Sequence, residues 1–231
     1  MAEEALSTRD RIIKAAATLL AEGGRDAVST RAVSAAAGVQ APTIYRGFGD
    51  MQGLLDEVAS YGFASYLKAK SERQLAEDPV DDLRAGWDLH IGFGLANPAF
   101  YTLMYGEPRP KSAPAAALRA QEILHSLVSR IAAAGRLAVS VERAAQMIHS
   151  AGCGVTLSLI ATKPEDRDPE LSTRVREAIL AAIIIDTARP AAAGTASHAI
   201  ALKASLPGAT TGLTEAEQAL LAQWLDRIAK A

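Results

Sequence analysis

The chain has 231 residues, of which 49% are hydrophobic, 22% are charged and only 5% are aromatic. This composition excludes a disordered chain, and so small an aromatic share is unusual for an all-β sandwich. The formal net charge of −2 carries no polycationic signature of a nucleic-acid-binding protein, so any affinity for DNA must come from the placement of charge.

Few features of the sequence bear on cellular location. Cys153 is the single cysteine, so no intrachain disulfide can form, which suits a reducing cytoplasm. The first residues, Met1 to Glu4, are acidic and lack the apolar core of a signal peptide, and no apolar run reaches the roughly 18 residues that span a bilayer. We therefore expect a cytoplasmic protein that makes no membrane contact.

Alanine-rich stretches favour helix, because alanine loses no side-chain entropy there, and they predict an all-α chain. The first helix is predicted to begin after Ser7, which forms a pair similar to a capping box with Asp10, and to end at Gly23 and Gly24. Apolar residues recur along one face of it, so this helix has one side to bury: Ile12, Ile13, Ala16, Leu19 and Leu20.

A second, shorter helix follows. Ser29 or Thr30 can cap its start, and Gly38 can supply the left-handed residue that ends it. We expect its buried side to consist of Val33, Ala36 and Ala37.

Pro42 predicts a third helix from about 41 to 47, because proline fits the first turn, where its missing N–H is not needed. Ile44 and Phe48 are expected to face inward. Asp50 is then predicted to cap a long fourth helix, interrupted at Asp78-Pro79, whose apolar residues are Leu54, Leu55, Val58, Phe63 and Leu67.

Beyond Pro79, helix-breaking residues divide the chain into five or six expected helices. The segment 190–194 is predicted to be a surface loop. Thr214 and Glu217 form a second capping box, which opens a terminal helix with an apolar side. The breakers lie at Asn97-Pro98, 106–114, Gly135, Lys163-Pro164, Arg189-Pro190 and Pro207-Gly208.

The segment 28–48 has the parts of a helix-turn-helix in order: a capped helix, small residues at the crossing, a turn glycine and a second short helix with polar residues outward. It resembles the TetR family, which shows a Thr-Arg opening, an Ala-Gly-Val turn and a Thr-Ile/Leu-Tyr-x-x-Phe recognition helix. The matching residues are Thr30-Arg31, Ala37-Gly38-Val39 and Thr43-Ile44-Tyr45 to Phe48, and the resemblance extends from about Thr8 to Leu55.

The resemblance implies a three-helix helix-turn-helix DNA-binding domain over residues 1–50 and a helical ligand-sensing and dimerisation domain over 51–231. It implies a ligand-responsive transcriptional regulator: a repressor released from a palindromic double-stranded DNA operator by a small, largely apolar effector.

The chain departs from the family at two positions. Relatives often carry a histidine where this chain has Gly47, and a phosphate-contacting lysine near Met51. The first fifty residues also contain six basic and six acidic residues. An alternative is therefore a helical ligand-binding or interaction protein whose helix-turn-helix no longer binds DNA.

Side-chain chemistry assigns roles within the motif. Hydroxyls near helix starts suit phosphate oxygens, and Thr30, Thr43 and Tyr45 carry them. Arginine can donate two hydrogen bonds to guanine, and glutamine can pair with adenine. We expect Arg31, Arg46 and Gln40 to read bases, and Ala41 and Pro42 to contact thymine methyl groups.

Two further sites are expected in the rest of the chain, and ordinary core packing remains the alternative for each. The homodimer interface is placed on two late apolar stripes: Val175, Ile179 and Ile183, and Leu221, Trp224, Leu225 and Ile228. The ligand pocket is placed where aromatic residues concentrate, at Trp87, His90, Phe93, Tyr101, Met104 and Tyr105.

Enzyme motifs are absent from the sequence. It has no Gly-x-Ser-x-Gly elbow, no phosphate-binding glycine loop and no His-Glu-x-x-His, so we expect no enzymatic activity, no catalytic residues and no cofactor. No metal site is indicated, and Cys153, between two glycines, is expected to be an inert buried thiol.

Overall fold

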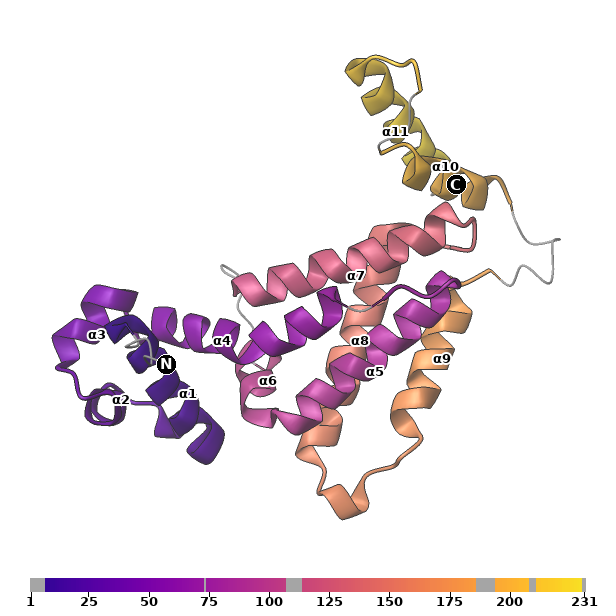
Figure 1. Ribbon diagram of the computed structural model, residues 1–231. Coiled ribbons are helices and arrows are strands. Elements are labelled where there is room, and N and C mark those ends of the chain that lie inside the picture. Colours follow the sequence, from indigo (N-terminus) through magenta and orange to yellow (C-terminus); the bar gives the residue numbers. More distant parts are fainter. Residues whose placement is uncertain (1–6, 73, 107–113, 186–193, 208–210, 230–231) are drawn as a thin grey trace.

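The computed structural model describes residues 7–72, 74–106, 114–185, 194–207 and 211–229 (Figure 1). These residues form eleven α-helices and one 3-10 helix and contain no strand, so the all-α prediction is confirmed. The elements are α1 (Thr8–Ala27), α2 (Thr30–Ala37), α3 (Ala41–Phe48), α4 (Met51–Ser71), α5 (Pro79–Ala96), α6 (Pro98–Tyr105), α7 (Ala115–Ala133), α8 (Val141–Ala161), η1 (Pro164–Asp166), α9 (Leu171–Ile183), α10 (Thr195–Ser205) and α11 (Glu215–Ala229). Seven α-helices thus follow Pro79, rather than the five or six expected, and most of the predicted loop 190–194 lies outside the described residues.

Helices α1 to α3 form a head at one end of the molecule (Figure 1). The Ser7 hydroxyl accepts from the Asp10 N–H at 3.1 Å and begins α1 as predicted. The predicted end of the helix at Gly24 is a kink instead, with φ 68°, after which one more turn continues to Ala27. The buried face of α2 is narrower than expected: Val33 and Ala37 are buried, one turn apart, whereas Ala36 is exposed.

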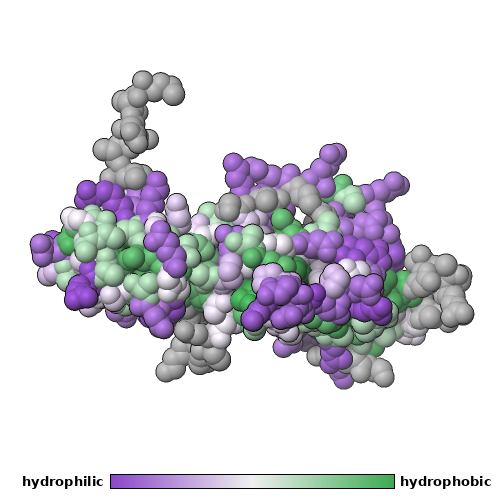
Figure 2. Space-filling model, turned by 90° about the horizontal axis from the view of Figure 1, so that it is seen from below, coloured by the Kyte–Doolittle hydropathy of each residue, from purple (hydrophilic) through white to green (hydrophobic). Residues whose placement is uncertain are grey.

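Helices α4 and α6 join the head to the rest of the chain, which we call the body. One continuous cluster of buried apolar side chains runs from α1 through α4 and α6 to α7. Figure 2 shows apolar residues at the surface where head and body meet. The contact between α4 and α6 is close, because a Cβ at Gly62 would lie 2.1 Å from the Phe100 ring. The Phe100 ring of α6 therefore packs directly against the backbone of α4 at Gly62.

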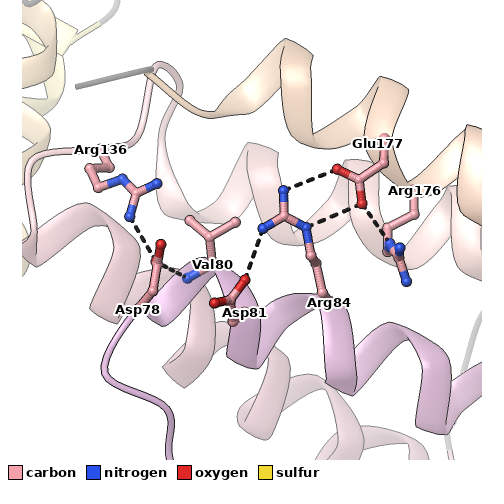
Figure 3. A network of polar contacts seen from close by, with 7 residues as sticks. All are labelled: Asp78, Val80, Asp81, Arg84, Arg136, Arg176 and Glu177. Atoms are coloured by element: carbon pink, nitrogen blue, oxygen red, sulfur yellow. Dashed lines mark hydrogen bonds and ion pairs between the residues drawn. The ribbon is translucent and has the colours of Figure 1, made fainter. Parts of the chain in front are cut away.

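The body packs α5, α7, α8 and α9 around a second apolar cluster, and polar contacts tie α5 to its neighbours. The Arg84 guanidinium on α5 donates to both carboxylate oxygens of Glu177 on α9, at 3.2 and 3.1 Å, and to Asp81 at 2.9 Å (Figure 3). Asp82 is fully buried and pairs with Arg130 of α7. Since a buried ion pair is costly to break, these contacts hold α5 in one position.

The last two helices, α10 and α11, form a hairpin beside α7, away from the head (Figure 1). The predicted capping box at the start of α11 is confirmed, since the Glu217 carboxylate accepts from the Thr214 N–H at 2.8 Å. Within the described part of the chain, α8 has the length and composition of a membrane-spanning helix, with a mean hydropathy of 1.3 in its most apolar window. It packs against α5, α7 and α9, as a core helix of a folded domain also would.

Candidate DNA-binding face and ligand cavity

The turn between α2 and α3 has the geometry that the motif predicts. The Ser29 hydroxyl accepts from the Ala32 N–H at 3.2 Å and begins α2, so Ser29 is the cap. Gly38 ends α2 in the left-handed region, with φ 63° and ψ 42°. Because side chains with a Cβ rarely adopt this conformation, the glycine sets the angle at which α3 leaves the turn.

Apolar side chains hold α2 and α3 on one side while polar ones remain outside. Val33 of α2 and Ile44 of α3 are completely buried. On the outer side, the Thr30 and Tyr45 hydroxyls lie 3.1 Å apart, so the start of α2 approaches the middle of α3. Tyr45 is 46% exposed, which leaves its hydroxyl free to turn toward a phosphate.

The arginines of the head divide into two kinds. Arg9 lies at the surface but is engaged by its neighbours: it donates to the Gly47 carbonyl at 2.6 Å, pairs with Glu57 of α4 at 2.7 Å and lies 4.5 Å from the centre of the Phe48 ring. Arg31 and Arg46 are exposed and form no ion pair within the described residues. Each follows one member of the Thr30 and Tyr45 pair, so two uncompensated cations flank the same point.

The remaining residues expected to contact DNA lie at the start of α3 or immediately before it, except Thr30, which begins α2. Gln40 and Pro42 are exposed, whereas Thr30, Ala41 and Thr43 are partly buried. Proline occupies the first turn of α3, as predicted. Thr30, Gln40 and Thr43 thus lie at the N-terminal ends of two helices, where free N–H groups and the helix dipole favour phosphate, whereas Tyr45 and Arg46 lie further along α3.

A small cavity of about 40 Å³ lies within the body. Five helices line it: α4, α5, α6, α7 and α8. Its polar lining residues are Tyr66, Lys70, His90, Tyr105 and His149, and its apolar ones include Leu83, Trp87, Leu124, Leu127 and Ile148. A water occupies roughly 10–15 Å³ by this kind of measure, so the closed cavity holds a few atoms and no more.

A chain of polar groups runs along one wall of the cavity. The Tyr66 hydroxyl lies 3.1 Å from His90 Nδ1, and His90 Nε2 lies 2.7 Å from the Tyr101 hydroxyl. Burial, followed by the charges of Lys70 and His149, lowers the pKa of His90 to about 3. The imidazole is therefore neutral at neutral pH and bridges the two hydroxyls with one donor and one acceptor nitrogen.

Lys70 is the cation of the cavity. It lies on the last turn of α4, is partly buried, and its Nζ lies 5.2 Å from the centre of the Tyr66 ring. Burial lowers the pKa of Lys70 to about 8. Burial first, and the charge of Lys70 second, also lower the pKa of His149. These shifts indicate a positive charge with poor solvation and no compensating carboxylate.

The residues predicted to bind ligand occupy two kinds of position. Trp87, His90 and Tyr105 line the cavity, whereas Phe93, Tyr101 and Met104 pack beside it in the apolar cluster.

Three of the polar lining residues were not predicted from the sequence: Tyr66, Lys70 and His149. A signal for Lys70 was present, because it continues the face of α4 that begins with Phe63 and Tyr66, at spacings of three and four residues.

Cys153 lies four residues after His149 on α8, and its sulfur is 3.7 Å from both imidazole nitrogens of that residue. This spacing is visible in the sequence but the contact was not predicted. Burial raises the pKa of the Cys153 thiol. The thiol is therefore protonated at neutral pH, as the expectation of an inert thiol requires.

The residues expected at the dimer interface differ in exposure. Ile183 and Leu225 are buried within the chain, and Val175, Ile179 and Leu221 are partly buried. Trp224 and Ile228 are 51% and 40% exposed on α11. With Leu220, which is also exposed, they form an apolar stripe at intervals of four residues.

Comparison with known proteins finds a family model that matches the head and the start of α4. Residues 12–58 match the family described as "Bacterial regulatory proteins, tetR family". No curated protein matches the chain.

Solved structures share the fold beyond the head. A protein of unknown function from Rhodococcus sp. RHA1 superposes with a TM-score of 0.66 at 21% identity, covering 79% of this chain and 98% of that one. The TetR family regulator PfmR from Thermus thermophilus gives 0.53 at 24% identity, covering 76% and 96%. A TetR variant from Acinetobacter baumannii AYE, in complex with minocycline, gives 0.55 at 20% identity, covering 73% and 89%. The arrangement of a helix-turn-helix head on a helical body is thus one that other proteins share.

Proposed function

We propose that the protein is a ligand-responsive transcriptional repressor acting in the cytoplasm as a homodimer, because residues 12–58 match the TetR family of bacterial regulatory proteins. The observation that supports this most directly is the outer side of α2 and α3. There the hydroxyls of Thr30 and Tyr45 lie 3.1 Å apart, and the next residue after each is an exposed arginine, Arg31 or Arg46, that forms no ion pair within the described residues. We propose no enzymatic activity.

In this proposal some residues of the motif contact the phosphates and others contact the bases. Thr30, Thr43 and Tyr45 donate to phosphates and set the position of α3 in the major groove. Arg31, Arg46 and Gln40 read base edges, each good two-bond contact contributing about 1–3 kcal/mol of discrimination, and Ala41 and Pro42 contact thymine methyl groups. Because Arg9 is neutralised by Glu57, it contributes little to the attraction of DNA.

A helix of eight residues reads too few base pairs to define an operator, which is why we propose a two-fold dimer. Its heads would enter major grooves about 34–36 Å apart on a palindromic site. The exposed stripe of α11, formed by Leu220, Trp224 and Ile228, supports a place for this helix in the contact. Large exposed apolar patches of this kind mark interaction sites.

Two helices, α4 and α6, contact both the cavity and the head, so they can transmit ligand binding to the DNA-binding motif. Tyr66 and Lys70 on α4, and Tyr105 on α6, line the cavity. Helix α4 also packs against α1 and α3, and α6 packs against α1. A ligand that binds one arrangement of α4 and α6 more tightly would change the separation of the heads and release the operator.

The test is binding of the purified protein to the DNA that flanks its own gene, measured by fluorescence anisotropy across a salt series. Real phosphate contacts make the affinity fall steeply with salt. We expect the double variant Arg31→Ala, Tyr45→Phe to lose specific binding. The matched control is Arg119→Ala, which removes an exposed arginine from α7, far from the motif in the sequence.

Salt-sensitive binding that disappears only in the motif variant would support the regulator. A folded protein that binds no DNA at low salt would refute it and favour the alternative, a helical ligand-binding protein whose helix-turn-helix no longer contacts DNA.

A further inference from the structure

We propose that the cavity of the body binds a small monoanion, a carboxylate on an apolar group, with the Lys70 ammonium as its counter-ion. The inference rests on the proposed sensing role of the body and adds the chemical class of the effector. It begins from one observation, a partly buried lysine that lines a cavity of the body.

Lys70 has no anionic partner in the described part of the chain. Its neighbour Lys68 points outward, is 72% exposed and lies 4.0 Å from Glu72, whereas Lys70 lines the cavity with only the Tyr66 ring beneath it. A buried charge without a partner is costly, so proteins pair such groups or use them to bind a ligand. The positive charge of Lys70 in the cavity would therefore be balanced by a ligand with one negative charge.

The groups around Lys70 define the charge of the guest. His90 and His149 face it from α5 and α8, and the lowered pKa values of both keep them neutral. Tyr66 and Tyr105 face it from α4 and α6, with pKa values raised by burial, so they remain protonated donors. One positive charge surrounded by neutral donors balances the single negative charge of a carboxylate. A dianion such as a phosphate monoester would keep one negative charge without a counter-ion.

The rest of the lining is apolar and favours an apolar body on the ligand. Leu83, Trp87 and Ile148 face the cavity, whose 40 Å³ accept a carboxylate group but not a larger molecule. A wider groove of about 440 Å³ between α7 and α8 shares Leu124 and His149 with the cavity. Because these two side chains line both hollows, their displacement would join the cavity to the groove and give room for the rest of the ligand.

The test uses tryptophan fluorescence, because Trp87 lines the cavity and Trp224 is the only other tryptophan. In a Trp224→Phe background, Trp87 reports binding without any DNA present. The probes are a pair of equal shape and different charge, 3-phenylpropanoate and 3-phenylpropan-1-ol, together with a second pair, octanoate and octan-1-ol.

At pH 7 we expect each carboxylate to bind at least about tenfold more tightly than its alcohol, as a charge-assisted hydrogen bond predicts. Lys70→Met should abolish that preference, Lys70→Arg should retain part of it, and Lys68→Met should leave it unchanged. Equal affinities for acid and alcohol in both pairs, or a preference that survives Lys70→Met, would overturn the proposal.

A pH series supplies an independent readout. Burial lowers the pKa of Lys70 into the range between pH 7 and 9, whereas it lowers the pKa values of His90 and His149 and raises those of Tyr66, Tyr105 and the nearby Cys153, away from this range. The carboxylate preference should therefore fall over this range in the parent and stay flat in Lys70→Met. Because fluorescence needs no operator, a failure here leaves DNA binding untouched, and loss of DNA binding leaves this result standing.

Discussion

Replacing Lys70 by methionine should stabilise the protein, although it removes a charged group from the proposed ligand site. Methionine retains most of the length of the side chain and its apolar stem and removes the ammonium. The ordinary pKa of this lysine side chain is 10.5, and burial lowers it to about 8. The fold therefore disfavours the charged form of Lys70, which is the form present at neutral pH.

The size of the effect follows from the two pKa values. Their difference of 2.5 corresponds to about 3 kcal/mol of destabilisation at pH 7, at about 1.4 kcal/mol for each pKa unit. Loss of the cation–π contact with Tyr66 offsets about 0.5–1 kcal/mol of the gain. We expect a net stabilisation of about 2 kcal/mol, or a rise in Tm of about 4–8 °C for a chain of this length.

The gain should depend on pH in a defined direction. Between pH 8 and 10.5 the unfolded chain binds the proton of Lys70 more strongly than the folded chain does, so the parent becomes more stable as pH rises. The advantage of Lys70→Met is thus complete below pH 8 and disappears above pH 10.5.

Urea unfolding followed by circular dichroism at pH 7 and pH 10, at one protein concentration, measures this difference. Lys68→Met is the control, since that lysine is 72% exposed and should change stability by no more than about 0.5 kcal/mol. A Lys70→Met protein that is less stable than the parent at pH 7, or equally stabilised at both pH values, would refute the reasoning.

Other contacts lead to further predictions. Asp82→Ala removes a fully buried carboxylate and leaves its arginine partner unpaired, so it should lower the free energy of unfolding in urea by about 3–5 kcal/mol. Asp81→Ala, at a site 59% exposed, should lower it by less than about 1 kcal/mol. Similar losses in the two variants would contradict the burial of Asp82. Gly62→Ala places a Cβ against the Phe100 ring and should lower the free energy of unfolding by about 1–3 kcal/mol, and a more stable variant would show that the two helices are further apart. Trp224→Asp should shift sedimentation toward the monomer, and an unchanged dimer would exclude the α11 stripe as its interface.

Residues within one or two turns of each other carry the features that the sequence predicts correctly. Ser7, Ser29 and Asp50 cap their helices, and Gly38 adopts the left-handed turn. Such signals act through hydrogen bonds between neighbours in the chain, so they need no knowledge of the rest of the fold. The helix-turn-helix is a sum of these local signals, which is why the motif could be identified from its residues alone.

The sequence predicts less well which residues of a helix are buried and which are exposed. Ala36 and Ala37 are chemically identical neighbours, yet one is exposed and the other buried, because the packing of α2 on its neighbours decides the width of the buried face. Likewise, Ile183 and Trp224 both belong to apolar stripes, but only the tryptophan remains exposed. Periodicity alone cannot distinguish a core face from an interface.

The cavity depended on the tertiary structure entirely. Lys70, His90, Tyr105 and His149 come from four helices and are separated by up to 79 positions in the chain. The sequence by itself determined the helix starts and the helix-turn-helix motif, since local hydrogen bonds and helical periodicity specify them. The packing of α4 to α8 decided that a partly buried lysine would line a cavity together with three neutral rings, because burial and charge depend on which side chains of distant segments meet.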